Sequence, residues 1–163
     1  MTQKKWLGWT AVLLWIGLIF FLTSQPAVDS NQLSKEISSI IISIMERMGT
    51  GRSINALWLN SFMRKAAHFM IFLILSILVM IVLSLDKTRS NRKNMVLAFG
   101  FSVALAIIDE TRQLFVPGRG ALVSDVLLDS TGALVGIGLW WLFFGKHRKS
   151  VVVRSKQNSN PDI

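Results

Sequence analysis

The chain has 163 residues, of which 52% are hydrophobic, and it carries 18 basic residues against 9 acidic ones. This composition is too apolar for an ordinary soluble domain and is typical of a small membrane protein with several spans. The absence of cysteine excludes disulfides and thiolate chemistry.

Four apolar stretches follow one another along the chain, at residues 6–22, 66–85, 95–114 and 126–144. Each is close to the ~20 residues that an α-helix needs to cross a hydrocarbon core of ~30 Å. Because unpaired backbone groups are not tolerated in lipid, we predict an all-α fold of four transmembrane helices. The first stretch resembles a signal peptide, but no small-residue cleavage site follows it.

The long segment between the first two stretches has a helical pattern of its own. Within Asn31–Gly49 the apolar residues recur at helical spacing, which predicts an extracytoplasmic amphipathic helix lying on the membrane or over the bundle. Residues 1–149 are thus interpreted as one transmembrane domain. Residues 150–163 are polar and are predicted to form a disordered tail.

The basic residues indicate the orientation of the chain. Eleven of the 18 lie before the first span, between the second and third, or after the fourth: Lys4, Lys5, Lys87, Arg89, Arg92, Lys93, Lys146, Arg148, Lys149, Arg154 and Lys156. Four spans place these segments on one side, which the positive-inside rule identifies as the cytoplasm. We therefore predict a multi-pass cell-membrane protein with both termini cytoplasmic, and no nucleic-acid partner.

Polar residues gather where the last three spans meet the outer side. They are Arg64, Lys65 and His68, then Asp109, Glu110, Arg112 and Gln113, then Arg119 in a Pro-Gly turn, and Asp125 and Asp129. Residues three or four apart share a helix face. A charge at the bilayer centre costs at least ~2.5–3.5 kcal/mol, so these faces should turn inward. We expect one shared pocket open to the outside.

Structural roles are open for several of these residues. Lys65 could reach the interface as a long end-of-helix side chain, and His68 could be a packing histidine. Asp109 and Arg112 could neutralise each other, and Asp125 could cap the fourth span. In that span, the Gly132-x-x-x-Gly136 pattern indicates close helix packing.

The polar motifs, taken with their order and spacing, resemble the VanZ-like family over about residues 10–145. They are Arg64-Lys65-Ala66-Ala67-His68-Phe69, Asp109-Glu110-Thr111-Arg112-Gln113 with the following Leu114–Arg119, and Ser124–Gly132, with Ser24-Gln25-Pro26 after the first span. The family often has Glu-Tyr where this chain has Ile71 and Phe72. The resemblance implies an envelope protein of a Gram-positive bacterium, associated with teicoplanin-type glycopeptide resistance.

The first functional hypothesis is a binding protein for membrane lipids, a lipid-linked cell-wall precursor or a glycopeptide. Arg64, Lys65 and Arg119 would hold phosphate, which arginine can bind bidentately. The remaining polar side chains would bind sugar hydroxyls or hold the basic residues in place: Gln113, Asp125 and Asp129.

The second hypothesis is an intramembrane hydrolase or transferase acting on a lipid-linked substrate. His68 would be the general base, oriented by Asp109 or Asp125, with Glu110 as the acid. One histidine among carboxylates could also hold a divalent ion, but no diagnostic spacing is present, so we predict neither metal nor cofactor.

Two further hypotheses remain open. An ion- or lipid-transporting homo-oligomer would use the buried acids and histidine as a relay, although the inner halves of the spans read as unbroken apolar sequence. A structural protein that helps partners assemble would need only the packing of these residues.

Overall fold

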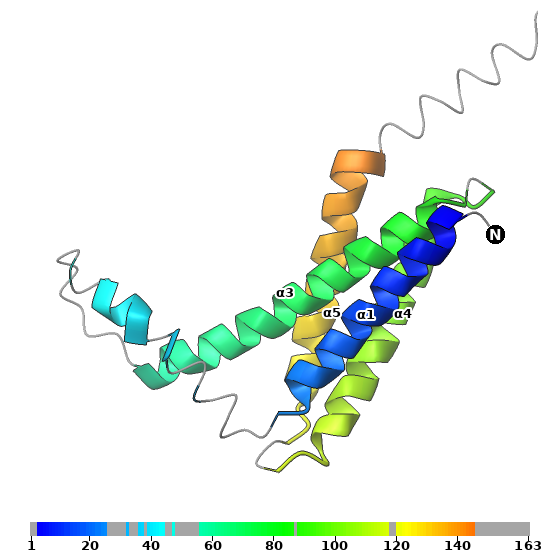
Figure 1. The fold of residues 1–163 in the computed structure, drawn as a ribbon. Coiled ribbons are helices and arrows are strands. Elements are labelled where there is room, and N and C mark those ends of the chain that lie inside the picture. The colour runs from blue at the N-terminus through cyan, green and yellow to red at the C-terminus, as the bar shows by residue number, and fades with distance from the viewer. Residues whose placement is uncertain are drawn as a thin grey trace, which may run out of the picture.

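The computed structural model describes residues 3–25, 32, 36–37, 39–44, 47, 56–86, 88–117 and 120–145. The long helices are α1 (Gln3–Thr23), α3 (Ala56–Ser84), α4 (Asn91–Gln113) and α5 (Val123–Trp140), and α5 continues into a π-helical turn, η1 (Trp141–Gly145) (Figure 1). No strand occurs in these residues, which confirms the predicted all-α class.

All four helices are long and apolar enough to cross a membrane, over Gln3–Thr23, Ser61–Ser84, Asn91–Gln113 and Val123–Gly145. Many large apolar side chains on their outer surfaces are exposed, among them Leu14, Phe21, Leu127 and Phe143. In water such a surface would be unfavourable, whereas lipid accommodates it. The chain is therefore a multi-pass membrane protein, as the sequence predicts.

The helices alternate in direction. The start of α1, the connection between α3 and α4, and η1 lie at one end of the bundle, here called the N-terminal end (Figure 1). The end of α1 and the connection between α4 and α5 lie at the opposite end, here called the polar end. At the N-terminal end, Lys5 Nζ lies 3.7 Å from Asp86 Oδ2 and links α1 to the α3–α4 connection.

The most extensive helix contact is between α3 and α5. A Cβ atom built on Gly132 would collide with the Phe69 carbonyl, and one on Gly136 would collide with the Leu73 carbonyl and the Ser76 hydroxyl. The two glycines therefore let the helix backbones approach each other, which confirms the close packing predicted from their spacing.

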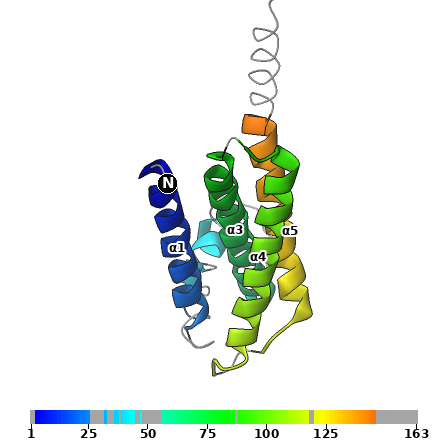
Figure 2. The ribbon, with the colours of Figure 1, turned by 90° about the vertical axis from the view of Figure 1, so that its right-hand side faces the viewer.

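Helix α1 lies at the edge of the bundle and packs chiefly on α3 (Figure 2). The Trp15 indole N–H donates to the Ile71 carbonyl at 3.1 Å, and Val12 and Ile19 are fully buried. Phe72 is 1% exposed and belongs to this apolar core. The position where the family often has tyrosine is thus a packing position in this chain.

Small polar side chains interrupt the apolar interior. Ser76, Asn94 and Ser102 are fully buried, and each donates to a helix carbonyl, those of Leu73, Leu83 and Ala98 respectively. The interpretation of the inner halves as unbroken apolar sequence was therefore wrong. The Ser76 and Ser102 bonds stay within one helix, whereas the Asn94 bond joins α4 to α3. All three satisfy polar hydrogens that burial would otherwise leave unpaired.

The predicted amphipathic helix at Asn31–Gly49 is not confirmed. Both of its ends lie outside the described residues, although residues 36–37, 39–44 and 47 have helical conformation. In this stretch Ile40 and Ile44 are 58% and 51% exposed. The tail at 150–163 also lies outside the described residues.

Candidate functional site

Three helices bring polar side chains together at the polar end of the bundle, and all but the partly exposed His68 are buried. His68 comes from α3, Asp109, Glu110 and Gln113 from α4, and Asp129 from α5. The four α4 and α5 side chains are at most 6% exposed, although they lie in spans built to cross lipid. As the sequence predicts, the polar faces turn into the bundle.

Asp109 is the best-bonded carboxylate of the site. Its Oδ1 atom accepts from the Thr23 hydroxyl at 2.6 Å and from Arg112 Nη1 at 3.2 Å, and its Oδ2 atom accepts from Gln113 Nε2 at 3.1 Å. A buried anion needs donors of this kind to offset its lost hydration. The predicted local pair of Asp109 and Arg112 is confirmed, and three donors hold the Asp109 carboxylate in place.

Arg112 joins α4 to the end of α1. Its guanidinium lies 4.2 Å from the centre of the Phe20 ring, and Nη2 donates to the Phe20 carbonyl at 3.4 Å and to the Ser24 hydroxyl at 2.5 Å. The Ser24 hydroxyl in turn donates to the Phe20 carbonyl. A cation is favourable at the C-terminus of a helix, where carbonyl groups lack intrahelical partners. We call these contacts, together with Thr23–Asp109, the α1–α4 clamp.

His68 faces Asp129 across the α3–α5 contact. The distance from His68 Nδ1 to Asp129 Oδ1 is 3.7 Å, longer than the ~3.2 Å limit of a typical N–H···O hydrogen bond. Asp109 and Asp125 also lie near enough to interact electrostatically with His68. The neighbouring carboxylate is therefore Asp129, and the sequence-based assignment of Asp109 or Asp125 as the orienting acid is corrected, because the glycines of α5 bring residue 129 closest.

Glu110 has two oxygens in different situations. Oε1 accepts from the backbone N–H of Leu122 at 2.5 Å, which holds the residue before α5. Oε2 is buried and has no hydrogen-bond partner among the described residues, and the same is true of Asp129 Oδ1. Buried acceptors are usually satisfied, so two unsatisfied carboxylate oxygens in one site call for an explanation.

Asp125 does not cap α5 as the sequence suggested. The N-cap is Leu122, which forms no side-chain cap bond, and Asp125 lies in the first helical turn. A carboxylate there still interacts favourably with the helix dipole. Its Oδ1 atom accepts from the Ser124 hydroxyl at 3.3 Å, and the side chain remains partly exposed at the polar end.

The basic residues expected around the site are only partly described. Arg64 is half-buried one helical turn before His68, and Lys65 is exposed. Neither forms an ion pair with any residue that the structure describes. Arg119 lies outside the described residues.

Two contributors from α1 were missed in the sequence. Thr23 is 4% exposed and bonds to Asp109, which lies 86 residues away, and Phe20 receives the Arg112 guanidinium. A hydroxyl directly after an apolar stretch was the available signal for Thr23. Nothing in the sequence marks Phe20 among its many apolar neighbours.

Metal binding finds no ready set of ligands in the described part of the chain, where no group of three or more histidine, aspartate or glutamate side chains is arranged to hold an ion. The arrangement can instead exchange protons between an imidazole and carboxyl groups, or accept hydrogen bonds from a polar ligand.

Comparison with known proteins places this geometry in a family. A family model described as VanZ/LLP1 matches residues 8–144. Neither a curated protein nor a solved structure matched the chain. The matched range includes the α1–α4 clamp and every polar residue from Arg64 to Asp129. Because it covers most of the chain, the protein belongs to the VanZ/LLP1 family.

Proposed function

We propose that this VanZ-type membrane protein serves the cell envelope by binding the polar headgroup of a lipid-linked cell-wall precursor, or a glycopeptide with similar groups, at the polar end. The observation that carries the proposal is the pair of buried, unsatisfied oxygens, Glu110 Oε2 and Asp129 Oδ1. An unsatisfied buried polar atom costs about 1–3 kcal/mol, which a ligand with hydrogen-bond donors would recover.

The charges of the site favour a ligand with two kinds of group. The site gathers three buried carboxyl groups and the partly exposed Asp125 near one imidazole, so it suits hydroxyl, amide or ammonium donors better than a bare anion. Arg64 and Lys65 lie at the edge, where arginine can bind a phosphate bidentately. A phosphate-linked sugar or peptide headgroup has both features.

The test is native mass spectrometry with lipid extraction on purified protein. We expect wild type to carry a precursor-type lipid, and Asp129→Asn and Glu110→Gln to lose it, because each variant replaces an acceptor oxygen with a donor while keeping side-chain volume. Asp86→Asn, an acid at the opposite end, is the matched control. Equal retention by wild type and both site variants would contradict the proposal.

A contribution to teicoplanin-type resistance is the cellular form of the same proposal. The variants should be compared in a glycopeptide-susceptible Gram-positive host at equal membrane abundance. Wild type should reduce susceptibility, and Asp129→Asn should not. If wild type leaves susceptibility unchanged while the purified protein still binds a precursor, the role in resistance is wrong and the binding role stands.

An intramembrane hydrolase or transferase is the second candidate, favoured by the position of His68 beside Asp129. Water or an acceptor hydroxyl would attack an ester or phosphoester while His68 takes its proton. Glu110 would donate a proton to the leaving oxygen. Purified protein should then convert a lipid-linked substrate, and His68→Gln should abolish turnover without loss of binding. Binding without any turnover would eliminate this candidate.

A further inference from the structure

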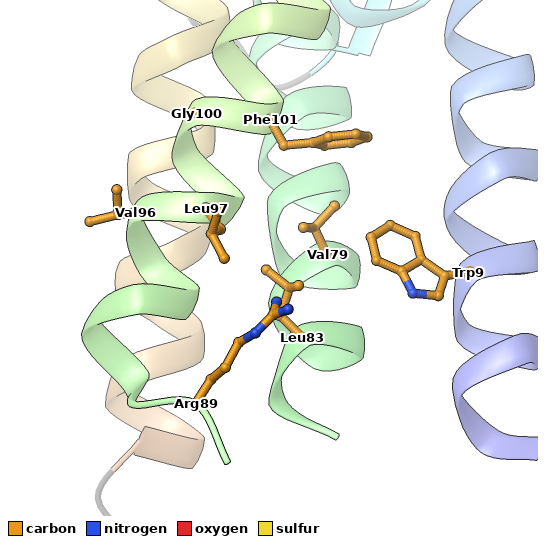
Figure 3. Close-up of a pocket in the computed structure, with 8 residues that line it drawn as sticks. All are labelled: Trp9, Val79, Leu83, Arg89, Val96, Leu97, Gly100 and Phe101. Carbon is orange, nitrogen blue, oxygen red and sulfur yellow. The ribbon is translucent and has the colours of Figure 1, made fainter. Parts of the chain in front are cut away.

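A hollow lies at the N-terminal end of the bundle and shares no residue with the polar site. It is a slot of about 450 Å³ between α1, α3 and α4 (Figure 3). Its walls are apolar and include Trp9, Val79, Leu83, Leu97 and Phe101. Small-molecule sites typically measure ~300–1,000 Å³, so the slot is large enough for part of a ligand.

The slot lies where α1 and α4 separate. The contacts described above join these two helices at the polar end only. The α1–α4 clamp holds them together at the polar end. Toward the N-terminal end, α1 packs on α3 instead, where a Cβ atom added to Gly8 would collide with the Val82 side chain. On the α4 side, Gly100 lines the slot, and a Cβ atom added to it would have no neighbour within 4 Å. Side chains therefore leave this space unfilled.

The slot has a basic residue where it meets the connection between α3 and α4. Arg89, from that connection, is exposed and lines the slot, and Figure 3 draws its side chain running toward Leu83. Among the described residues Arg89 forms no ion pair. The neighbouring Arg92 and Lys93 are also exposed, whereas Lys5 is already paired with Asp86.

We propose that this slot binds an anionic phospholipid of the leaflet at the N-terminal end, with an acyl chain between α1 and α4 and its phosphate on Arg89. The apolar walls select a hydrocarbon chain, and a slot between two membrane-crossing helices is within reach of the lipid around them. The Arg89 guanidinium attracts the net negative charge of an anionic headgroup more strongly than a zwitterionic headgroup, which has no net charge.

The experiment titrates detergent-purified protein with phosphatidylglycerol or phosphatidylcholine carrying brominated acyl chains, which quench nearby tryptophan. Subtracting the signal of Trp9→Phe isolates the indole in the slot. We expect phosphatidylglycerol to quench Trp9 at lower concentration than phosphatidylcholine does. Arg89→Gln should weaken the apparent affinity for phosphatidylglycerol about fivefold. Arg92→Gln, a nearby arginine outside the slot, is its control.

Filling the slot gives the second arm of the test. Gly100→Phe should abolish the Trp9 quenching, because the new ring occupies the open space. Gly17→Phe is the matched control, since Gly17 is also exposed on a helix, has nothing within 4 Å of a Cβ and lies outside the slot. Quenching that persists in Gly100→Phe, an equal loss in Gly17→Phe, or equal affinity for the two lipids would each overturn the proposal.

Discussion

Asp109 makes its polar contacts with side chains of two helices. Thr23 contributes a hydroxyl from α1, and Arg112 and Gln113 contribute charged and amide donors from α4. An anion held this way is favourable as a structural element, whereas the same carboxylate without donors would be costly. The residue therefore links the stability of the polar end to the position of α1.

Replacing Asp109 with asparagine should destabilise the protein. The variant removes the negative charge that faces Arg112 and places an amide where donors converge. We expect a loss of about 2 kcal/mol, within the range for hydrogen bonds to charged groups, and a fall in Tm of about 4–8 °C in detergent. Thermal unfolding followed by circular dichroism measures it.

Glu36→Gln is the control, because Glu36 is an exposed acid distant in sequence from Asp109. It should change stability by less than about 0.5 kcal/mol. Equal melting temperatures for wild type and Asp109→Asn would show that the three donors contribute nothing net.

Local spacing and long-range geometry were not equally predictable at the residue scale. Asp109 and Arg112 lie three residues apart in one helix and therefore share a face, so their pairing could be predicted. The approach of His68 to Asp129 depends on which faces of α3 and α5 meet, and a single helix does not contain that information. The contact of Arg112 with the Phe20 carbonyl spans 92 residues and was missed for the same reason.

At the scale of elements, α5 depends on small residues to reach α3. Gly136→Leu should destabilise the bundle by about 3 kcal/mol, because the side chain would collide with the Leu73 carbonyl and the backbones would have to separate. Gly138→Leu is the matched control on the same helix, with nothing within 4 Å of a Cβ.

The control should be neutral or stabilising, since removing glycine from a helix gains about 0.5–1 kcal/mol. The measurement is the fraction folded after heating in detergent. Similar losses in the two variants would mean that the α3–α5 contact is not specific to position 136.

The connection between α3 and α4 contains a carboxyl group outside the membrane spans. Hydrogen bonds from the hydroxyl and the N–H of Thr88, at 2.7 and 3.1 Å, hold the pKa of the Asp86 carboxyl below its usual range. A group whose pKa is lower in the folded chain adds stability above its unfolded pKa of about 3.9. That contribution is lost as the pH falls through the folded pKa.

Thr88→Val should therefore raise the pKa of Asp86 part of the way to its usual value, because the hydroxyl donor is removed and the N–H remains. Carboxyl NMR titration measures the pKa directly. Thr111→Val, whose hydroxyl donates to the Ile107 carbonyl instead, is the control and should leave the Asp86 titration unchanged. An unchanged pKa in Thr88→Val would exclude the hydroxyl as a cause.

Element boundaries differed from the predicted stretches for identifiable reasons. Helix α3 begins at Ala56 rather than near residue 66, because Arg64 and Lys65 continue the helix although they end the apolar run. Helix α4 begins at Asn91, where the Ser90 side chain accepts the Lys93 N–H at 3.4 Å. Hydropathy marks the part of a helix inside lipid, whereas hydrogen bonds determine where the helix begins.

At the scale of the whole molecule, four spans and the gathering of polar residues at one end could be predicted from the sequence. Predicting the spans requires only the length of each apolar stretch, and predicting their alternating direction requires only their number. The position of α1 at the edge of the bundle, the α1–α4 clamp and the slot could not be predicted from the sequence. All three depend on how unevenly α1 packs against α3 and α4.

The predicted orientation can be tested cleanly, since the chain has no cysteine. Gly120→Cys places a thiol in open space at the polar end, and Arg92→Cys places one at the exposed start of α4. A membrane-impermeant maleimide added to intact cells should label Gly120→Cys only, and should label both after permeabilisation. Labelling of Arg92→Cys alone in intact cells would show that the chain has the opposite orientation.

The pairing of Asp109 with Arg112 within one helix also bears on biogenesis. A single charge at the centre of a span costs about 2.5–3.5 kcal/mol to insert, and a charge near the end of a span, where these two residues lie, costs less. Because the counter-charge lies three residues away on the same helix, a newly made α4 can enter lipid already neutralised, with α1 not yet docked. Helix α1 is synthesised before α4 and carries no charge from Trp6 to Thr23, so it can stay in the bilayer until Arg112 reaches its C-terminal carbonyl groups.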